Sequence, residues 1–299
     1  MFLYDEWLSS GERVALEPRS RRAAPLPTFH IFCRVSARTA APWLTLLHGF
    51  PSSSWDYAKV LLGLEAEFRV VAFDFLGFGN SDKPRSSRYM IHQQADLTEA
   101  VWRHFSVRRT AIVAHDYGVS VAQELLARRE QGAEAVEVSG ITFLNGGLYA
   151  DLHRPLAVQR LLRKPLVGPL ISALANEWMF RRNFRKVFSH RHLPSPAEIG
   201  QHWRVITRRG GHRLAHRLIH YMADREQFCR RWEGAIESTR VPLQFVWGMA
   251  DPVSGAHVAD RIRARLPRAR LVELTDVGHY PQLEAPERVL PEILRMMHL

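Results

Sequence analysis

The sequence predicts an α/β protein whose mostly parallel sheet carries helices on both faces. Two observations support this fold class. Apolar, β-rich runs recur along the chain, and helix-like segments lie between most of them. The 299 residues, with 46% hydrophobic and 24% charged side chains, have an ordinary globular composition that can bury a large core.

Seven apolar runs are the predicted strands, and they are followed by turn signals. They cover residues 28–35, 43–50, 68–75, 110–117, 140–147, 243–252 and 269–279. The alternation of strands and helices breaks after Tyr149 and resumes near Val241, and the residues between them are helical in character. We therefore expect an α/β core made of residues 1–148 and 240–299, with a helical cap, residues 149–239, inserted into it.

The cysteines and the apolar segments predict the cellular setting. Cys33 and Cys229 give no disulfide framework and no metal-ligand spacing, which favours a reducing compartment. The first twenty residues mix acidic with apolar side chains, unlike a signal peptide. No stretch has the uncharged length of a membrane span. We expect a soluble cytoplasmic protein, and its oligomeric state stays open.

The formal net charge of +11 comes mostly from arginine. The basic residues are spread along the chain without a nucleic-acid motif, so we expect no nucleic-acid partner and attribute the excess to composition. The apolar segment at residues 165–180 is too short to span a bilayer. It is expected to be the packing face of the cap, and peripheral membrane contact through the cap is the alternative.

The most informative junction is the tetrapeptide His-Asp-Tyr-Gly, residues 115–118, where a predicted strand runs into a predicted helix. Functional groups gather at the carboxyl ends of parallel strands. A side chain on such a tight turn stands exposed above the sheet, as at a nucleophile elbow. The helix N-terminus stabilises Asp116 as the anion, and a carboxylate can attack carbon to form an alkyl ester. The alternative for Asp116 alone is a plain helix N-cap.

Further strand ends supply partners for that carboxylate. The backbone N–H groups of Phe50 and Tyr117 can form an oxyanion hole. Asp251 and His279 follow the last two predicted strands, so the chain order is nucleophile, acid, histidine, as in hydrolytic triads on such sheets. Asp276 is a rival for the acid. We prefer Asp251, because Asp276 is well placed to shape the turn before His279.

Five segments together resemble a known superfamily. They are HGFPSSSWDY, DFLGFGNSDKP, HDYG, WGMADP and GHYPQLEAPE. These segments look like the epoxide-hydrolase and haloalkane-dehalogenase branch of the α/β-hydrolase superfamily, from about Trp43 to the C-terminus. The resemblance implies an α/β-hydrolase fold, a cap between the sixth and seventh core strands, and a triad of Asp116, His279 and Asp251. It is specific for the aspartate nucleophile and only weakly specific for the substrate.

The elbow departs from the family pattern. Members often read His-Asp-Trp-Gly-Gly, and here Tyr117 and Val119 stand in place of the Trp and the second Gly. In haloalkane dehalogenases that Trp helps to hold the departing halide, and Tyr117 has no equivalent donor. Phe50 is not the second halide donor that those enzymes commonly carry. Asn145, at the end of its predicted strand, is expected to shape a turn, and the alternative is that it approaches the site. These departures weaken the halide interpretation.

Epoxide hydrolases instead use cap tyrosines to protonate the epoxide oxygen, a role that suits a buried phenol. Tyr221, in the second half of the predicted cap, is the better candidate, and Tyr149, at the entry to the cap, is the other. We therefore predict a hydrolase that acts on a mainly apolar small molecule, most consistent with an epoxide hydrolase. The alternatives are a haloalkane dehalogenase and a ligand-binding protein of this fold with little or no activity.

No metal or organic cofactor is predicted, because nucleophile, base and water complete the reaction. His212, His216 and His220 fall four residues apart, on one face of a helix. That spacing could form a metal face, but no carboxylate completes a known pattern such as H-E-x-x-H. We expect these histidines to pack within the cap or to face solvent.

Overall fold

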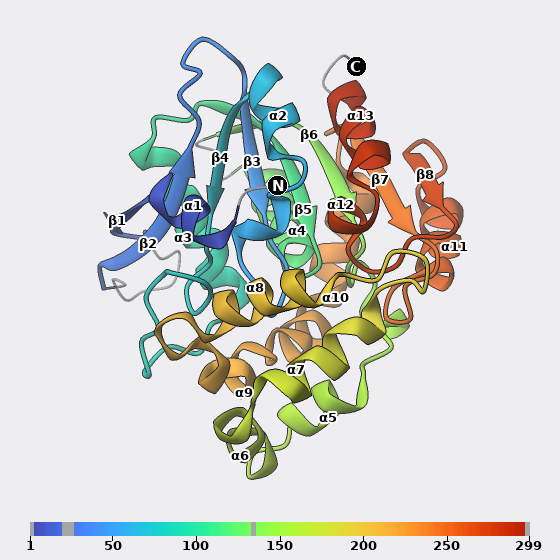
Figure 1. Ribbon diagram of the computed structural model, residues 1–299. Helices are drawn as coiled ribbons and strands as arrows, with labels where there is room; N and C mark the ends of the chain where they lie inside the picture. The colour runs from blue at the N-terminus through green and yellow to red at the C-terminus, as the bar shows by residue number, and fades with distance from the viewer. Residues whose placement is uncertain (1–2, 20–26, 133–135, 297–299) are drawn as a thin grey trace.

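The computed structural model describes residues 3–19, 27–132 and 136–296, which form an eight-stranded sheet in the order β1-β2-β4-β3-β5-β6-β7-β8 (Figure 1). The strands are β1 (Glu12–Leu16), β2 (Phe29–Val35), β3 (Trp43–Leu47), β4 (Arg69–Phe73), β5 (Arg109–His115), β6 (Glu137–Leu144), β7 (Leu243–Gly248) and β8 (Arg270–Leu274). The pairs β1–β2 and β2–β4 are antiparallel, and all pairs from β4 to β8 are parallel. The predicted α/β fold with a mostly parallel sheet is confirmed.

Strand β1 lies outside the seven predicted runs. Its burial alternates, with Val14 and Leu16 facing the core and Glu12 and Ala15 exposed. A five-residue edge strand of this kind lacks the continuous apolar run by which the other strands are recognised. It is held by antiparallel pairing with β2, a contact between segments that the sequence pattern does not reveal.

The central strands are apolar on both sides because helices cover both faces of the sheet. Alternate residues of β5 belong to different core clusters. Ala111 and Val113 pack into one cluster, whereas Ile112 and Ala114 pack into the other. Strand β5 is therefore buried from Thr110 to its end, and its last residue leads directly into the candidate site.

Two sets of helices form these layers. Helices α2 (Leu61–Glu67) and α13 (Pro286–Met296) contribute to one core cluster. Helices α3 (Ile91–His104), α4 (Tyr117–Glu130) and α11 (Ala256–Arg265) contribute to the other. The remaining elements of the core are α1 (Tyr4–Ser9), η1 (Ser54–Tyr57) and α12 (Pro281–Glu284).

Every described element between β6 and β7 is helical, and we call residues 149–239 the helical insertion. Its elements are η2 (Ala150–Leu152), α5 (Ala157–Leu162), α6 (Val167–Leu174), α7 (Glu177–Phe184), η3 (Arg185–Val187), α8 (Pro196–Thr207), η4 (Arg208–Leu214), α9 (Ala215–Leu218) and α10 (Tyr221–Ser238). In Figure 1 most of this segment lies beneath the ends of the strands, with α6 at the tip. Whether it behaves as a separate cap domain with the predicted boundaries stays a prediction.

Across the described residues, no helix combines the length and the apolar character needed to cross a bilayer.

Candidate active site

The centre of the site is the sharp turn from β5 into α4, where Asp116 has φ 47° and ψ −101°. A positive φ is unusual for a residue other than glycine and is held only by its surroundings. Here the Asp116 N–H donates to the Asn145 carbonyl oxygen at 2.9 Å, and the Gly118 N–H donates to the His48 carbonyl oxygen at 2.9 Å. A Cβ on Gly118 would lie 2.4 Å from the carbonyl oxygen of Leu47, so only glycine lets α4 approach β3 this closely.

Val119, which replaces the usual glycine of the family pattern, is fully buried beneath the turn. Space for the Val119 side chain is available because the residue opposite it, just after β6, is Gly146. A Cβ on Gly146 would meet Val119 Cγ2 at 2.7 Å and Asp116 Cα at 3.0 Å. The larger side chain is therefore matched by a glycine on the neighbouring segment.

The two carboxylate oxygens of Asp116 face different partners. The backbone N–H of Phe50 donates to Oδ1 at 2.8 Å. Nε2 of His279 lies 3.4 Å from Oδ2. One oxygen is thus held by a backbone donor, while the other stands beside the imidazole. The Tyr117 N–H begins α4 directly after Asp116, and its part in an oxyanion hole stays a prediction.

The other side of the imidazole contacts the acid that the sequence favours. Nδ1 of His279 lies 2.7 Å from Oδ2 of Asp251. Asp251 is fixed in turn, because Ser254 Oγ donates to it at 2.6 Å and the Val253 N–H donates at 2.7 Å. The rival Asp276 instead pairs with the side chains of Arg288, at 2.6 Å, and His192, at 3.2 Å.

Asn145 does more than shape a turn, which corrects the expectation from the sequence. Its Nδ2 donates to Oδ2 of Asp251 at 3.0 Å and to the Gly248 carbonyl oxygen at 2.9 Å, while its Oδ1 accepts from the Gly248 N–H at 2.6 Å. The amide therefore joins the ends of β6 and β7 and orients the carboxylate of Asp251.

Charge within the site is strongly coupled. Burial raises the pKa of Asp116, but the hydrogen bond and charge of His279, with Arg225 and His115, outweigh it and hold that pKa below its ordinary value. Burial lowers the pKa of His279, yet Asp251 and Asp116 together raise it to about 10. Burial likewise raises the pKa of Asp251, which His279 and Ser254 bring below its usual range. The two carboxylates therefore favour the protonated form of His279 while Asp116 carries its charge.

Arg225 of α10 is a buried cation beneath the turn, and the sequence reasoning missed it. Its Nη2 donates to the Asp116 carbonyl oxygen at 2.9 Å, and its Nε donates to Ser120 Oγ at 2.6 Å. The guanidinium also lies over the Tyr221 ring, 4.5 Å from its centroid. The available signal was the i, i+4 spacing of Tyr221 and Arg225 on one helix. Arginine is seldom fully buried, so burial could not be inferred from its type.

Two further histidines support the turn from below. Nε2 of His115 donates to the His279 carbonyl oxygen at 2.8 Å, and burial lowers the pKa of His115 to about 3. The Phe75 N–H donates to Nε2 of His48 at 3.0 Å, and burial lowers the pKa of His48 to about 4. Both rings are neutral packing and hydrogen-bonding groups.

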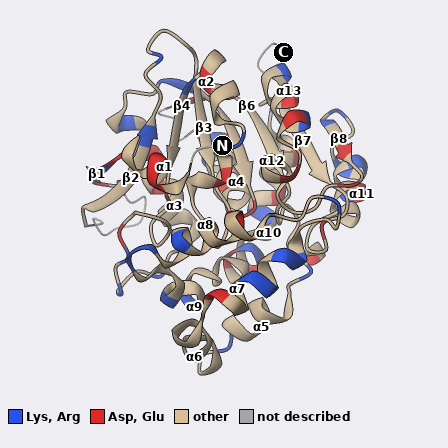
Figure 2. Ribbon diagram, viewed as in Figure 1, with Lys and Arg blue, Asp and Glu red and all other residues tan. Residues whose placement is uncertain are grey.

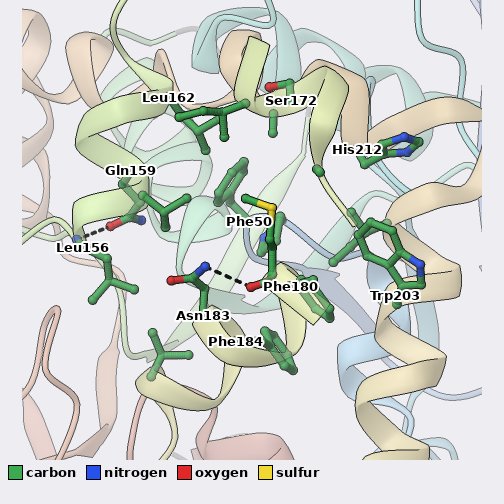
Figure 3. A pocket seen from close by; sticks show the side chains of 18 of the residues that line it. Phe50, Leu156, Gln159, Leu162, Ser172, Phe180, Asn183, Phe184, Trp203 and His212 are labelled. Carbon is green, nitrogen blue, oxygen red and sulfur yellow. Dashed lines mark hydrogen bonds between the residues drawn. The ribbon is translucent and has the colours of Figure 1, made fainter. Parts of the chain in front are cut away.

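A cavity of about 160 Å³ opens in front of the carboxylate, between the sheet and the helical insertion. Asp116, His279, Phe50 and Tyr280 line it on the core side, and α5 to α8 provide most of the remaining wall. Figure 3 shows Phe50 near the centre, with Leu162 and Ser172 on one side and Phe184 on the other. No Lys or Arg lines it among the described residues, so it suits an uncharged, mainly apolar ligand.

The structure does not bring Tyr149 to this cavity, which corrects one predicted site residue. Its ring lies under the Arg261 guanidinium, 5.3 Å from the ring centroid, and the carboxylates that raise its pKa after burial are Glu237 and Glu233. The chain leaves β6 toward α11 at this point, so Tyr149 faces the flank of the core. The family resemblance alone could not show this direction.

Tyr221 lies beside the site without lining the cavity. Its ring centroid is 5.8 Å from that of Phe50 and 5.1 Å from that of Tyr117, and burial followed by the charge of Asp116 raises its pKa. Tyr280, which the sequence reasoning missed, does line the cavity, and its hydroxyl donates to the Phe50 carbonyl oxygen at 3.4 Å. In the sequence, the only indication that Tyr280 belongs to the site is its position directly after His279.

Three comparisons with known proteins show the family and the fold of this chain. A family model described as alpha/beta hydrolase fold matches residues 42–286. The mesoderm-specific transcript protein of Mus musculus is 40% identical over 250 residues, which cover 81% of this chain and 75% of that protein. LipZ of Mycobacterium tuberculosis is 38% identical over 276 residues, which cover 92% and 95%. The solved structure of haloalkane dehalogenase DbeA from Bradyrhizobium elkani matches with a TM-score of 0.75 at 24% identity, over 93% of this chain and 95% of that one.

Proposed function

The chain belongs to the alpha/beta hydrolase fold family, and from that premise we propose that it is a hydrolase with Asp116 as its nucleophile. One observation carries the proposal. The Asp116 carboxylate faces an apolar cavity while the Phe50 N–H holds one oxygen at 2.8 Å and His279 stands 3.4 Å from the other. Asp251 lies behind His279, so nucleophile, base and acid form one connected unit.

The first step is attack on carbon. Oδ2 of Asp116 displaces the leaving group from an electrophilic carbon of the substrate and forms an alkyl ester, while Oδ1 stays on the Phe50 N–H. Because its pKa is held low, Asp116 is already anionic and needs no base for this step. The loss of its charge on alkylation removes one of the two carboxylates that keep His279 protonated.

The second step is hydrolysis of that ester. With Asp116 neutralised, the pKa of His279 falls, so the imidazolium can release its proton to solvent, and the neutral imidazole can then take a proton from the attacking water. The water attacks Cγ of Asp116, and negative charge develops on Oδ1. The Phe50 N–H, already aimed at that oxygen, stabilises the charge, together with the Tyr117 N–H. Collapse of the intermediate breaks the ester bond, and the second proton of the attacking water passes to the departing alkoxide, which frees the alcohol and restores the carboxylate.

We propose that the electrophile is an epoxide in a mainly apolar molecule. Epoxide opening leaves the oxygen attached to carbon, so the developing alkoxide needs a nearby acid. The phenol of Tyr280 lines the cavity, and Tyr221 packs behind Phe50. Halide release would need donors around a departing anion. The Tyr117 hydroxyl does not serve as such a donor, because it donates to the Tyr89 carbonyl oxygen at 3.1 Å.

The test is a panel of apolar epoxides and haloalkanes, with diol formation and halide release measured separately. We expect epoxide turnover, and we expect Tyr280→Phe to reduce it about ten-fold or more if that phenol is the acid. Tyr221→Phe tests the second phenol in the same way. Tyr149→Phe is the matched control, because that tyrosine is equally buried but lies away from the cavity. Efficient halide release without epoxide opening would identify a dehalogenase, and no turnover in either assay would favour a binding protein.

A further inference from the structure

The tip of the helical insertion exposes large apolar side chains. Nine such side chains are exposed in the described residues, and six of them come from α5 to α7 and their connections. We call these six the apolar tip; they are Leu161, Leu166, Val167, Leu170, Leu174 and Trp178. Leu166 is 89% exposed and Trp178 is 67% exposed. Single exposed leucines are ordinary, whereas a gathering of this kind marks an interaction surface.

Helix α6 is apolar on both of its sides. Leu170 and Leu174 are exposed, at 59% and 63%, whereas Ile171 lines the cavity together with Ser172, whose hydroxyl accepts from the His216 N–H at 3.0 Å. The sequence Val167–Leu174 contains no charged residue. A helix that is apolar all round needs a second apolar environment besides its own protein. Helix α6 lies furthest from the sheet in Figure 1, so no described part of the core provides that environment.

The surroundings of the apolar tip are strongly basic. Residues 152–191 contain nine Lys or Arg and a single acid, Glu177. Glu177 is already paired with Arg181 at 2.6 Å. Arg160 and Lys164, close in sequence to Leu161 and Leu166, are exposed, and the exposed Arg182 guanidinium lies 5.7 Å from the centroid of the Trp178 ring. Figure 2 shows α6 without charge and Lys or Arg on the neighbouring α7 and α9.

These charges favour one occupant over a second copy of the chain. Two apolar tips brought face to face would place their basic residues against one another, which is unfavourable. The surface of an anionic bilayer instead attracts such residues, while leucine and tryptophan side chains enter the region between headgroups and acyl chains. An apolar face with a basic rim is the composition of a segment that lies on a membrane without crossing it.

We propose that the apolar tip docks this protein onto the surface of an anionic lipid bilayer. The same helices form the wall of the cavity, so docking brings the cavity close to molecules that partition into lipid. Docking itself does not depend on the proposed chemistry, because it uses side chains that do not line the cavity.

Sedimentation with lipid vesicles tests the proposal. The wild-type chain should bind vesicles of phosphatidylglycerol and phosphatidylcholine, and it should bind pure phosphatidylcholine at least about ten-fold more weakly. Leu170→Asp combined with Leu174→Asp should weaken binding about ten-fold or more, because the charges must leave water. Leu62→Asp on α2 is the matched control, since Leu62 is 66% exposed on a different helix, and it should bind like wild type. Circular dichroism checks that each variant is folded.

Charge reversal provides a second arm. Lys164→Glu combined with Arg182→Glu should weaken binding to the anionic vesicles, whereas Arg268→Glu, a change at an exposed arginine after α11, should not. Equal binding of folded wild type and the Leu170→Asp, Leu174→Asp variant would overturn the proposal. The proposal would also be overturned if the wild type did not bind vesicles but formed a dimer in analytical ultracentrifugation, and if the Leu170→Asp, Leu174→Asp variant did not form that dimer. Vesicle binding is read without substrate, so it can fail while the hydrolase proposal stands.

Discussion

At the scale of single residues, Asp116 is held in a conformation that an aspartate adopts only under constraint. Its φ of 47° costs roughly 1–3 kcal/mol, and hydrogen bonds to Asn145 and Arg225 maintain it. The same turn presents the carboxylate to Phe50 and His279. The strained backbone conformation therefore places the buried Asp116 carboxylate opposite a hydrogen-bond donor, the Phe50 N–H, and a base, His279.

The acid of the proposed triad can be identified by comparing two carboxylates. Asp251→Asn should reduce ester hydrolysis by on the order of 10³ to 10⁴ while alkylation persists, because Asp251 contacts His279 and not Asp116. Asp276→Asn should have little effect, since Asp276 pairs with Arg288 and His192. Burst and steady-state kinetics on the folded variants separate the two steps. A larger loss with Asp276→Asn would show that the wrong carboxylate was chosen.

The coupling of charges predicts how the imidazole titrates. In the wild type, Asp251 and Asp116 raise the pKa of His279 to about 10 against the opposing effect of burial. Asp116→Asn removes one negative charge, as alkylation would, so the pKa of His279 should fall. The imidazolium should then lose its proton at a lower pH than in the wild type. Nitrogen NMR of the labelled ring measures both titrations, and an unchanged pKa would contradict the proposed switch from ion-pair partner to base.

At the scale of elements, the junction between β5 and α4 depends on glycine. Gly118→Ala should destabilise the protein by about 1–3 kcal/mol, because the new Cβ would lie 2.4 Å from the Leu47 carbonyl oxygen, a backbone atom. Gly234→Ala on α10 is the matched control, since nothing lies within 4 Å of its Cβ. That change should stabilise the chain by up to about 1 kcal/mol through helix propensity. Thermal unfolding should shift in opposite directions, and equal shifts would contradict the close approach of α4 to β3.

The elements that the sequence predicts are those with a recognisable pattern in their own residues. The strand that ends at His115 is a continuous apolar run that leads into a helix, and its place in the sheet is confirmed. Strand β1 has no such run and depends on pairing with β2, so it was missed. The candidate triad residues follow strand ends and could be found from their order. Arg225, Asn145 and Tyr280 act through contacts between distant segments, which the order of residues does not reveal.

The direction of a side chain after a strand is similarly hidden in the sequence. Tyr149 and Tyr221 are both buried tyrosines of the helical insertion, and the sequence offers both as candidate proton donors, with Tyr221 as the better match to the family. The structure places Tyr221 against Phe50 and Tyr149 under Arg261. The difference is set by how the chain leaves β6 and how α10 packs on α4, which are properties of tertiary structure.

At the scale of the whole molecule, the positive charge is unevenly placed. The formal net charge is +11, and residues 152–191 contain nine Lys or Arg against one acid. The sequence reasoning treated the excess as spread along the chain. In the stretch that contains the apolar tip the excess is larger than elsewhere, and Figure 2 shows Lys or Arg on α7 and α9 beside the uncharged α6, an arrangement that favours a lipid surface.

This distribution bears on nucleic acids as well. We expect weak, sequence-independent binding of DNA and RNA that weakens steeply as salt increases, because only phosphate contacts are involved. Fluorescence anisotropy with several unrelated oligonucleotides, at low and at physiological salt, measures this. Tight binding to one sequence at physiological salt would mean that the basic residues recognise nucleic acid and that the hydrolase account is incomplete.

The most direct test of the account concerns the whole reaction cycle. His279→Gln removes the base that activates water but leaves Asp116 and the Phe50 N–H in place, so the alkyl ester should form and persist. Mass spectrometry of this variant, after incubation with a substrate that the wild type turns over, should show an adduct on the peptide that contains Asp116. Asp116→Asn combined with His279→Gln should show none. An adduct on another residue, or no adduct with such a substrate, would contradict Asp116 as the nucleophile.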